Sequence, residues 1–177
     1  NCFHPDTELS VEINGEWRRL TIKKLVETYL DPEADGYDES YDDGTVVHDL
    51  QQHPDIDSIR VPSMNDDGQK TMESVTHISK HVAQDHMVEI DRDNGETLVV
   101  TPEHTLPVSE SGDPNNREAF DVEVGDELFG YSSAASKTSC GESPRVSGPF
   151  DGVTVQDVRY VESDLEYTYN LTVENTN

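Results

Sequence analysis

The sequence has little positive charge, few apolar residues and only two cysteines. Lys and Arg together number 12 against 38 Asp and Glu, which gives a net charge of −26 over 177 residues. The chain therefore lacks the clustered basic residues that bind phosphates or anionic lipids, which excludes a general nucleic-acid or membrane-surface binder. No apolar run approaches the roughly 20 residues of a membrane span, and no signal peptide is visible. Two cysteines cannot build a disulfide-rich secreted scaffold, so we expect a cytoplasmic protein. We also expect it to be a monomer.

The shortage of apolar residues has two possible explanations. Hydrophobic residues make up 32% of the chain, well below the about 45–50% of an ordinary domain. Disorder would show high charge without periodicity, whereas a halophilic globular protein keeps its strand pattern and places Asp and Glu on solvent faces. The strand pattern described next favours the second explanation. Molar salt shortens the Debye length to about 3 Å and screens the self-repulsion of such a chain, so we expect a high-salt cytoplasm.

Short strand-like segments separated by tight turns predict an all-β (mostly β) fold class with one short helix. Residues Glu8 to Ile13 alternate between polar and apolar, and Asn14-Gly15 favours a type I′ hairpin because both of its central residues need positive φ. Asp93-Asn94-Gly95 and Val124-Gly125-Asp126 predict two further tight turns. The remaining strands are predicted over residues 16–20, 59–63, 73–79, 86–91, 97–101, 106–109, 119–124, 127–131, 153–161 and 166–174.

One helix and two irregular segments interrupt the predicted strands. Apolar residues at i, i+3 and i+4 predict a helix over residues 22–30, with Thr21 as its N-cap and Asp31-Pro32 as its end. Residues 31–57 are rich in Asp, Glu and Gly and predict an acidic surface insertion, whereas residues 132–148 predict a flexible Ser-, Gly- and Pro-rich loop. The acidic run lacks the spacing of a calcium loop, and the histidines lack zinc-ligand spacing. No metal and no cofactor are therefore predicted.

Three segments far apart in the sequence carry residue types that can do chemistry. Cys2 lies in NCFHPDT at the start, and Asn170 lies in YNLTVE near the end. Between them, Thr101 and His104 stand in TPEH directly after a hydrophobic strand. A Thr and a His three residues apart on a strand-to-turn element can point hydrogen-bond donors at one carbonyl or amide. Each segment alone carries little information, so their order along the chain matters.

In this order the segments resemble the Hint superfamily and, within it, the inteins. Cys2 to Thr7 is similar to the family's opening block, and GETLVVTPEHTLPV is similar to its second block. AFDVEVGDEL resembles the segment that follows, and Tyr167 to Glu174 resembles the late block, which usually reads YDLTVE. The Asn before the Cys, CFHPDT and the early helix resemble more narrowly the inteins of the archaeal D-family DNA polymerase (polymerase II) large subunit. The resemblance implies one Hint domain over residues 2–177, with a horseshoe-like, pseudo-two-fold β fold.

The resemblance also implies a chemistry. Cys2 would attack the carbonyl of Asn1, the last residue of the upstream flank (the N-extein), in an N-to-S acyl shift. His104 would protonate the departing amide nitrogen, and Thr101 would hold the scissile bond by hydrogen bonding. Asn170 stands where the family usually carries Asp. Because an amide cannot ionise, this departure puts the coupling of thiol activation to the acyl shift in doubt, although amide hydrogen bonding remains.

The resemblance further implies how far the reaction can go. The family's last strands carry a His, a penultimate His and a terminal Asn, but here the sequence ends at Asn175-Thr176-Asn177. We therefore expect the N-terminal part of an autocatalytic, single-turnover splicing element that acts on its flanking exteins and needs a complementary C-terminal fragment. Only residues 109–160 separate the second and late blocks, and they show no LAGLIDADG motif, so a mini-intein without a homing endonuclease is expected. Cys140, in the predicted loop, is expected to be an exposed free thiol.

Two alternatives compete with the splicing hypothesis. A hedgehog-type autoprocessing domain of the same superfamily also uses a Cys, a TxxH motif and a thioester, and it needs no terminal His-Asn. Such proteins are extracellular and less acidic, which disfavours this alternative. A non-catalytic halophilic β module that binds cations or a basic partner belongs to another class. Only this module would be indifferent to replacement of Cys2 by Ala.

Overall fold

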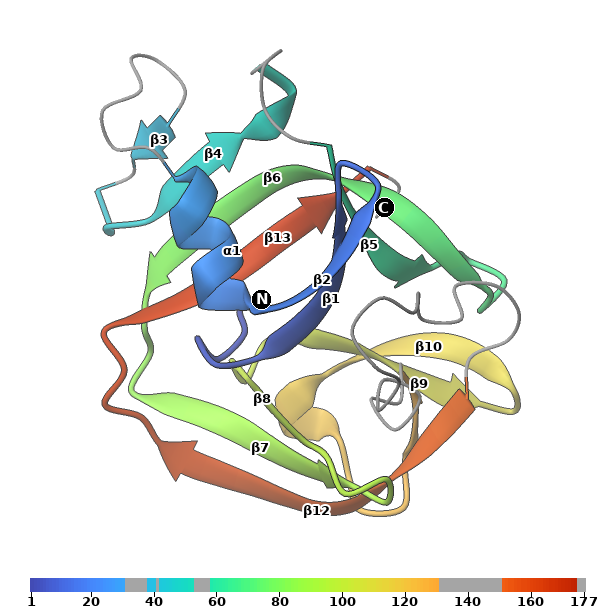
Figure 1. Ribbon diagram of the computed structural model, residues 1–177. Coiled ribbons are helices and arrows are strands. Elements are labelled where there is room, and N and C mark those ends of the chain that lie inside the picture. Colours follow the sequence, from blue (N-terminus) through green and yellow to red (C-terminus); the bar gives the residue numbers. More distant parts are fainter. Residues whose placement is uncertain (31–37, 41, 53–57, 131–150, 175–177) are drawn as a thin grey trace. The chain divides into compact units, whose positions relative to one another are not determined.

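The computed structural model describes residues 1–30, 38–40, 42–52, 58–130 and 151–174, which fold into two sheets and one α-helix (Figure 1). This confirms the predicted all-β fold class. None of the described helices is long and apolar enough to cross a membrane. By its internal contacts the chain divides into two compact units. The first unit comprises Asn1, Ser63–Thr71 and Asp85–Ser163, and the second comprises Cys2–Pro62, Met72–Gln84 and Asp164–Asn177.

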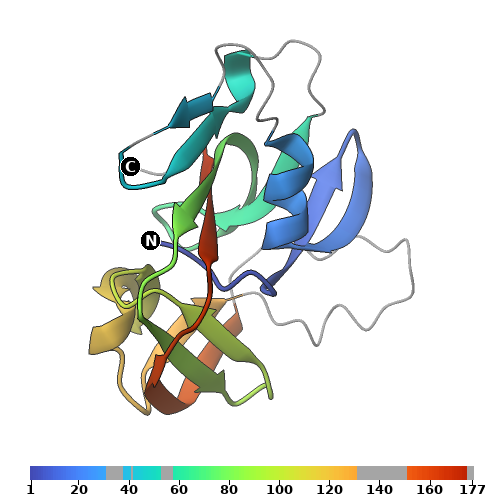
Figure 2. The same cartoon turned by 90° about the vertical axis from the view of Figure 1, so that its left-hand side faces the viewer.

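A seven-stranded antiparallel sheet makes up most of the second unit. Its strand order is β2-β1-β5-β6-β4-β3, and β13 also pairs with β6. Figures 1 and 2 both show β13 running beside β6. The bounds are β1 (Glu8–Ile13), β2 (Glu16–Thr21), β3 (Asp38–Ser40), β4 (Val46–Asp49), β5 (Ile59–Met64), β6 (Lys70–Val82) and β13 (Tyr167–Val173).

The local signals at the start of the second unit are confirmed. Asn14 and Gly15 have φ of 52° and 81°, as the predicted type I′ turn requires. The helix α1 spans Ile22–Tyr29, and the Thr21 hydroxyl caps it by accepting a hydrogen bond from the Lys24 N–H at 3.2 Å. The predicted helix end at Asp31-Pro32 lies outside the described residues.

Helix α1 closes the hydrophobic core of the second unit. Three of its side chains are fully buried, and each contributes about 1.5–3 kcal/mol by leaving water. They pack with residues of both the early and the late strands, so this core ties the two ends of the unit together. The core comprises Val11, Ile13, Ile22, Leu25, Val26, Leu50, Ile59, Val61, Val75, Ile78, Tyr169 and Val173.

The acidic segment predicted as a surface insertion is more ordered than expected. Its described parts contain β3, β4 and a short 3-10 helix over Leu50–Gln52, and β4 pairs with β6. The side chain of His48 on β4 is only 1% exposed. The prediction of an irregular excursion was therefore wrong for β4, because strand β6 supplies backbone partners that the polar local composition does not reveal. Residues 31–37, 41 and 53–57 of this segment lie outside the described residues.

A six-stranded antiparallel sheet makes up most of the first unit, in the order β10-β9-β11-β12-β7-β8. The predicted turns at Gly95 and Gly125 are confirmed, with φ of 82° and 96°. The predicted loop over residues 132–148 lies outside the described residues. The bounds are β7 (His86–Arg92), β8 (Thr97–Val100), β9 (Thr105–Glu110), β10 (Asp113–Glu118), β11 (Glu127–Gly130) and β12 (Asp151–Glu162).

The strand predicted over residues 119–124 is absent, and a strand that was not predicted precedes it. Ala119–Asp121 form a 3-10 helix, η2, and Ala119 and Val122 are both buried. Apolar residues three apart suit one helical turn better than the alternation of a strand, so this prediction was wrong. The missed strand is β10, which returns from β9 through Ser111-Gly112, whose φ values are 56° and 92°.

Candidate active site

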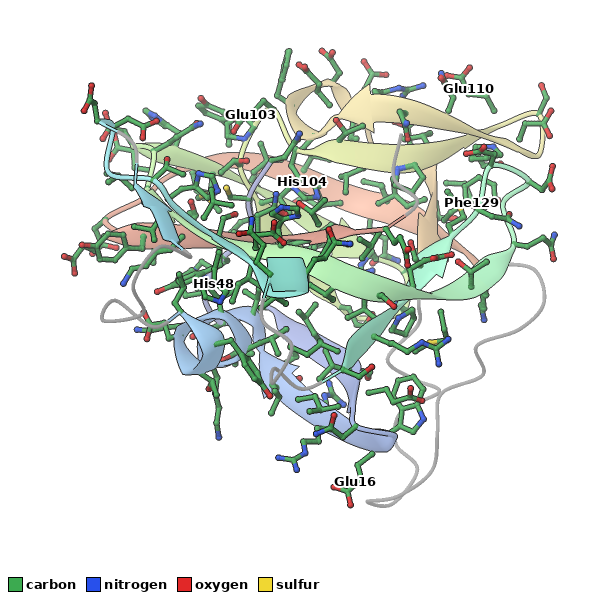
Figure 3. The ribbon with its side chains drawn as sticks, turned by 90° about the horizontal axis from the view of Figure 1, so that it is seen from above. Glu16, His48, Glu103, His104, Glu110 and Phe129 are labelled. Atoms are coloured by element: carbon green, nitrogen blue, oxygen red, sulfur yellow. The ribbon has the colours of Figure 1, made fainter. Side chains whose placement is uncertain are left out.

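The TPEH segment forms a tight turn between β8 and β9 in the first unit. Thr101 and His104 are buried, with exposed fractions of 1% and 8%. The His104 N–H donates to the Thr101 carbonyl at 3.0 Å, which closes the turn, and the Ala119 N–H donates to the His104 carbonyl at 2.8 Å. Helix η2, which was predicted as a strand, therefore holds this turn in place by a backbone hydrogen bond. Figure 3 labels Glu103 and His104, the two adjacent residues of this turn that bear titratable side chains.

The imidazole of His104 is neutral at pH 7. Burial lowers its pKa from 6.5 to about 4, and the positive charge on the Asn1 amino group adds to the shift. The carboxylate of Glu103 acts in the opposite direction but does not outweigh them. One ring nitrogen of a neutral imidazole donates a hydrogen bond and the other accepts, so His104 is equipped to take up a proton and to give one.

Asn1 is held on the same turn from two sides. Its amino nitrogen lies 3.2 Å from Glu103 Oε1, and its side-chain Oδ1 accepts a hydrogen bond from the Thr105 N–H at 3.0 Å. Burial raises the pKa of Glu103, but hydrogen bonds from its own backbone N–H, from Thr101 and from the Asn1 amino group outweigh this and leave the pKa below its usual range. Apart from the presence of a carboxylate inside TPEH, no sequence pattern signals either contact.

Cys2 begins the second unit and is 6% exposed. The next residue, Phe3, forms an antiparallel bridge with Tyr169 of β13. The Phe3 N–H donates to the Tyr169 carbonyl at 2.8 Å, and the Tyr169 N–H donates back at 3.2 Å. The register of this bridge sets Cys2 opposite Asn170. Since Phe3 and Tyr169 exchange both hydrogen bonds, Cys2 and Asn170 form the neighbouring non-hydrogen-bonded pair, in which side chains lie closest.

Asn170 also has a cross-strand neighbour on its other side. β13 pairs with β6 in a register that sets Asn170 opposite Ser79. Tyr169, which precedes Asn170 in the strand, belongs to the hydrophobic core. Because side chains alternate across a strand, Cys2, Asn170 and Ser79 share the sheet face that points away from this core.

The predicted site residues thus fall into two groups. The first unit brings Thr101 and His104 together with Asn1, and the second unit brings Cys2 together with Asn170. Among the described residues, no group of three or more His, Cys, Asp or Glu side chains could hold a metal ion. Cys140 lies outside the described residues.

Solved intein structures share the fold of this chain, although no family model matches its sequence. A crystal structure of an intein from a hyperthermophile superposes with a TM-score of 0.75 at 23% identity, covering 98% of this chain and 90% of that one. The crystal structure of the transcription factor IIB Mvu mini-intein gives a TM-score of 0.76 at 16% identity, covering 98% and 90%. The solution structure of the Pab PolII intein gives 0.71 at 21% identity, covering 98% and 92%.

Curated relatives of this chain are DNA polymerase II large subunits. That of Haloarcula marismortui is 36% identical over 99% of this chain and 12% of the polymerase. That of Halobacterium salinarum is 32% identical over 100% of this chain and 14% of the polymerase. The chain therefore spans about an eighth of the length of these relatives.

Proposed function

We propose that the chain is a self-splicing intein of an archaeal DNA polymerase II large subunit. It has the Hint fold of inteins. It is also similar along nearly its whole length to a segment of such a polymerase. Its partners are then the flanking polymerase segments, and its location is the high-salt cytoplasm of the host. The observation that carries the proposal is that each of the first two residues is positioned by contacts with a predicted site segment. Asn1 is bound on the TPEH turn, and Cys2 is set opposite Asn170.

The first step is an acyl shift at the Asn1–Cys2 peptide. The Cys2 sulfur attacks the Asn1 carbonyl carbon, the C–N bond breaks, and the proton that leaves the thiol ends on the Cys2 nitrogen. We assign His104 to this proton transfer. A neutral imidazole first accepts the proton and then delivers it to the departing nitrogen, so the low pKa of His104 suits the step. In a chain that continues upstream of Asn1, a peptide replaces the amino group, and burial is left as the main cause of that pKa.

Thr101 has an indirect place in this scheme. It hydrogen-bonds the carboxylate of Glu103, and Glu103 in turn contacts Asn1. We therefore assign Thr101 and Glu103 to holding the residue before the scissile bond. A group fixed close to its attacking partner reacts faster because the entropy of positioning has already been lost on folding.

Completion of splicing needs the family's closing strands with their His and Asn residues, and we propose that β13 receives them. One edge of β13 pairs with β6, and on the other edge Tyr169 bridges Phe3. A further strand added beside β13 would bring these residues to the segment that carries Asn170. Cyclisation of the arriving Asn would then release the downstream flank.

Thiol-induced cleavage tests the first step. The chain is expressed behind a reporter flank, incubated in molar KCl with an added thiol, and analysed by mass spectrometry. We expect cleavage after Asn1 that disappears in Cys2→Ala and persists in the matched control Cys140→Ala. Cleavage that persists in Cys2→Ala, or a native chain that never cleaves, would contradict the proposal, and the latter outcome would favour a non-catalytic module.

Ligation in trans tests the later steps separately. A peptide carrying the family's closing strands, penultimate His and terminal Asn is added together with a downstream flank. We expect the two flanks to be joined. Failure with every such peptide, while thiol cleavage still occurs, would overturn the role given to β13 and leave the first step intact.

A further inference from the structure

A chain of hydrogen-bonding groups runs from the segment just before β4 to β6, toward Asn170 in the second unit. Ser79 Oγ lies 2.8 Å from His81 Nε2, and His81 Nδ1 lies 3.3 Å from Thr45 Oγ1. Thr45 in turn hydrogen-bonds the Asp43 carboxylate through both its hydroxyl and its N–H, the latter at 3.0 Å. These contacts connect a carboxylate to the cross-strand neighbour of Asn170. No motif in the sequence marked them.

The carboxylate end sets the direction of the first bond in this chain. An ionised carboxylate only accepts, so the Thr45 hydroxyl donates to Asp43 and its oxygen is left to accept from His81 Nδ1–H. We assign His81 the neutral tautomer with its proton on Nδ1, so that Nε2 accepts a hydrogen bond from the Ser79 hydroxyl. Ser79 is therefore left with oxygen lone pairs, and it faces Asn170 as an acceptor.

An amide fits such a neighbour and a carboxylate does not. Asn170 can donate from its side-chain nitrogen to Ser79, which turns its side-chain oxygen toward Cys2 on the opposite side of the strand. An Asp at this position would present two acceptors, and Ser79 could satisfy it only by reversing the bonds to His81 and Thr45. The departure from the family's usual Asp thus coincides with a hydrogen-bond chain that suits Asn.

We propose that Ser79 and His81 are positioning residues that fix the orientation of the Asn170 amide, so that its oxygen accepts a hydrogen bond from the Cys2 thiol before the acyl shift. This inference rests on the proposed splicing function and deepens it. The oriented amide replaces the alignment, not the charge, that an Asp would provide. Proton transfer stays with His104.

The histidine His77 provides a matched control on the same strand. It pairs in register with Thr172, and its ring contacts Thr76 Oγ1 at 3.0 Å and Asp49 at 3.7 Å, so it takes no part in the bonds that reach Asn170. The side chains of His77 and His81 are both half-buried.

The test measures the rate of thiol-induced cleavage in molar KCl with the reporter flank attached. We expect Ser79→Ala and His81→Gln to slow cleavage on the order of tenfold, His77→Gln to leave it unchanged, and Ser79→Thr to restore it because the hydroxyl returns. Thermal unfolding of each variant accompanies the rates. A native-like rate in both Ser79→Ala and His81→Gln would overturn the inference.

A second set of variants separates positioning from a structural effect. In an Asn170→Asp background the amide is gone, so we expect Ser79→Ala to change the rate by less than about twofold. An equal loss in both backgrounds would show that Ser79 acts only through the fold, and it would overturn the inference. If the native chain shows no Cys2-dependent cleavage, the proposed function itself fails, which is a different result from native cleavage that ignores Ser79.

Discussion

The two units differ in how they hold the residues assigned to the proposed reaction. In the first unit, His104 sits on a buried turn whose environment keeps the imidazole neutral. In the second unit, Cys2 lies beside a strand whose face away from the hydrophobic core carries hydrogen-bonding side chains. Burial thus sets the protonation state of His104, whereas strand register sets the position of Cys2. Under the proposed function, one sheet would supply the electrostatics of the acyl shift and the other its geometry.

Both units place their few basic residues against carboxylates. In the first unit, Arg159 contacts Glu89, Asp91 and Asp157 at 3.0, 2.7 and 2.6 Å. In the second unit, Arg19 pairs with Glu8 at 2.6 Å. Sharing one guanidinium among several carboxylates offsets more repulsion for each positive charge. Exposed pairs are individually weak, however, so most of the charge of −26 must still be screened by salt.

After the loss of the nucleophile in Cys2→Ala, the largest effect expected from a single substitution is that of His104→Ala on the first step. Loss of the group that exchanges the proton should slow thiol-induced cleavage by about 10²–10⁴-fold. The matched control is His86→Ala in the same unit, where the ring stacks on Tyr160 with centroids 4.9 Å apart. Equal cleavage rates in the two variants would contradict the role given to His104, and with it the comparison between the units.

Salt should have the next largest effect, and it should act on stability. Raising KCl from about 0.1 M to 1 M shortens the Debye length from about 10 to 3 Å, and we expect a gain on the order of several kcal/mol in the free energy of unfolding. Urea unfolding followed by circular dichroism at each salt concentration measures it. A stability that stays flat or falls across this range would contradict the halophilic interpretation.

Acid should destabilise the first unit through His104. Its pKa is about 4 in the folded chain against 6.5 for an unperturbed histidine, so between these values the unfolded chain binds more protons. Stability is therefore lost as the pH falls from about 6.5 to 4, by up to about 3 kcal/mol. His104→Gln cannot titrate, and urea unfolding at both ends of this window should show a smaller acid loss for this variant. An equal loss in both proteins would show that His104 is not buried in its neutral form.

The smallest effect concerns the residue before the scissile bond. Asn1→Leu removes the side-chain oxygen that accepts from the Thr105 N–H, and we expect cleavage to slow about fivefold, the equivalent of one net hydrogen bond. Asn1→Gln keeps the carbonyl on a longer side chain and should recover part of the rate. Indifference to both changes would mean that the first unit does not select this residue.

Local signals account for the parts of the fold that could be predicted from the sequence. The turns at Asn14-Gly15 and Gly95, and the helix capped by Thr21, depend on residues close together in the chain. Strand β4 escaped prediction because its partner β6 lies far away in the sequence. Helix η2 was missed although the three-residue spacing of Ala119 and Val122 was a local signal for it.

The candidate site likewise contains residues that local motifs predict and contacts that they do not. The residues Cys2, Thr101, His104 and Asn170 were predicted from family resemblance, because each lies in a recognisable motif. The hold of Thr105 on Asn1 and the contact between Ser79 and His81 depend on backbone position and register, which carry no motif. Such supporting contacts become visible only when the strands are paired.

The most direct test of the central claim is the distance between the Cys2 thiol and the His104 imidazole in the folded chain. A crystal structure grown from molar KCl, with a few upstream residues attached before Asn1, would provide it. Our account predicts that both groups lie within hydrogen-bond reach of the Asn1–Cys2 peptide, since one acyl shift needs both there. A structure that places Cys2 and His104 on opposite faces of the molecule would contradict the account.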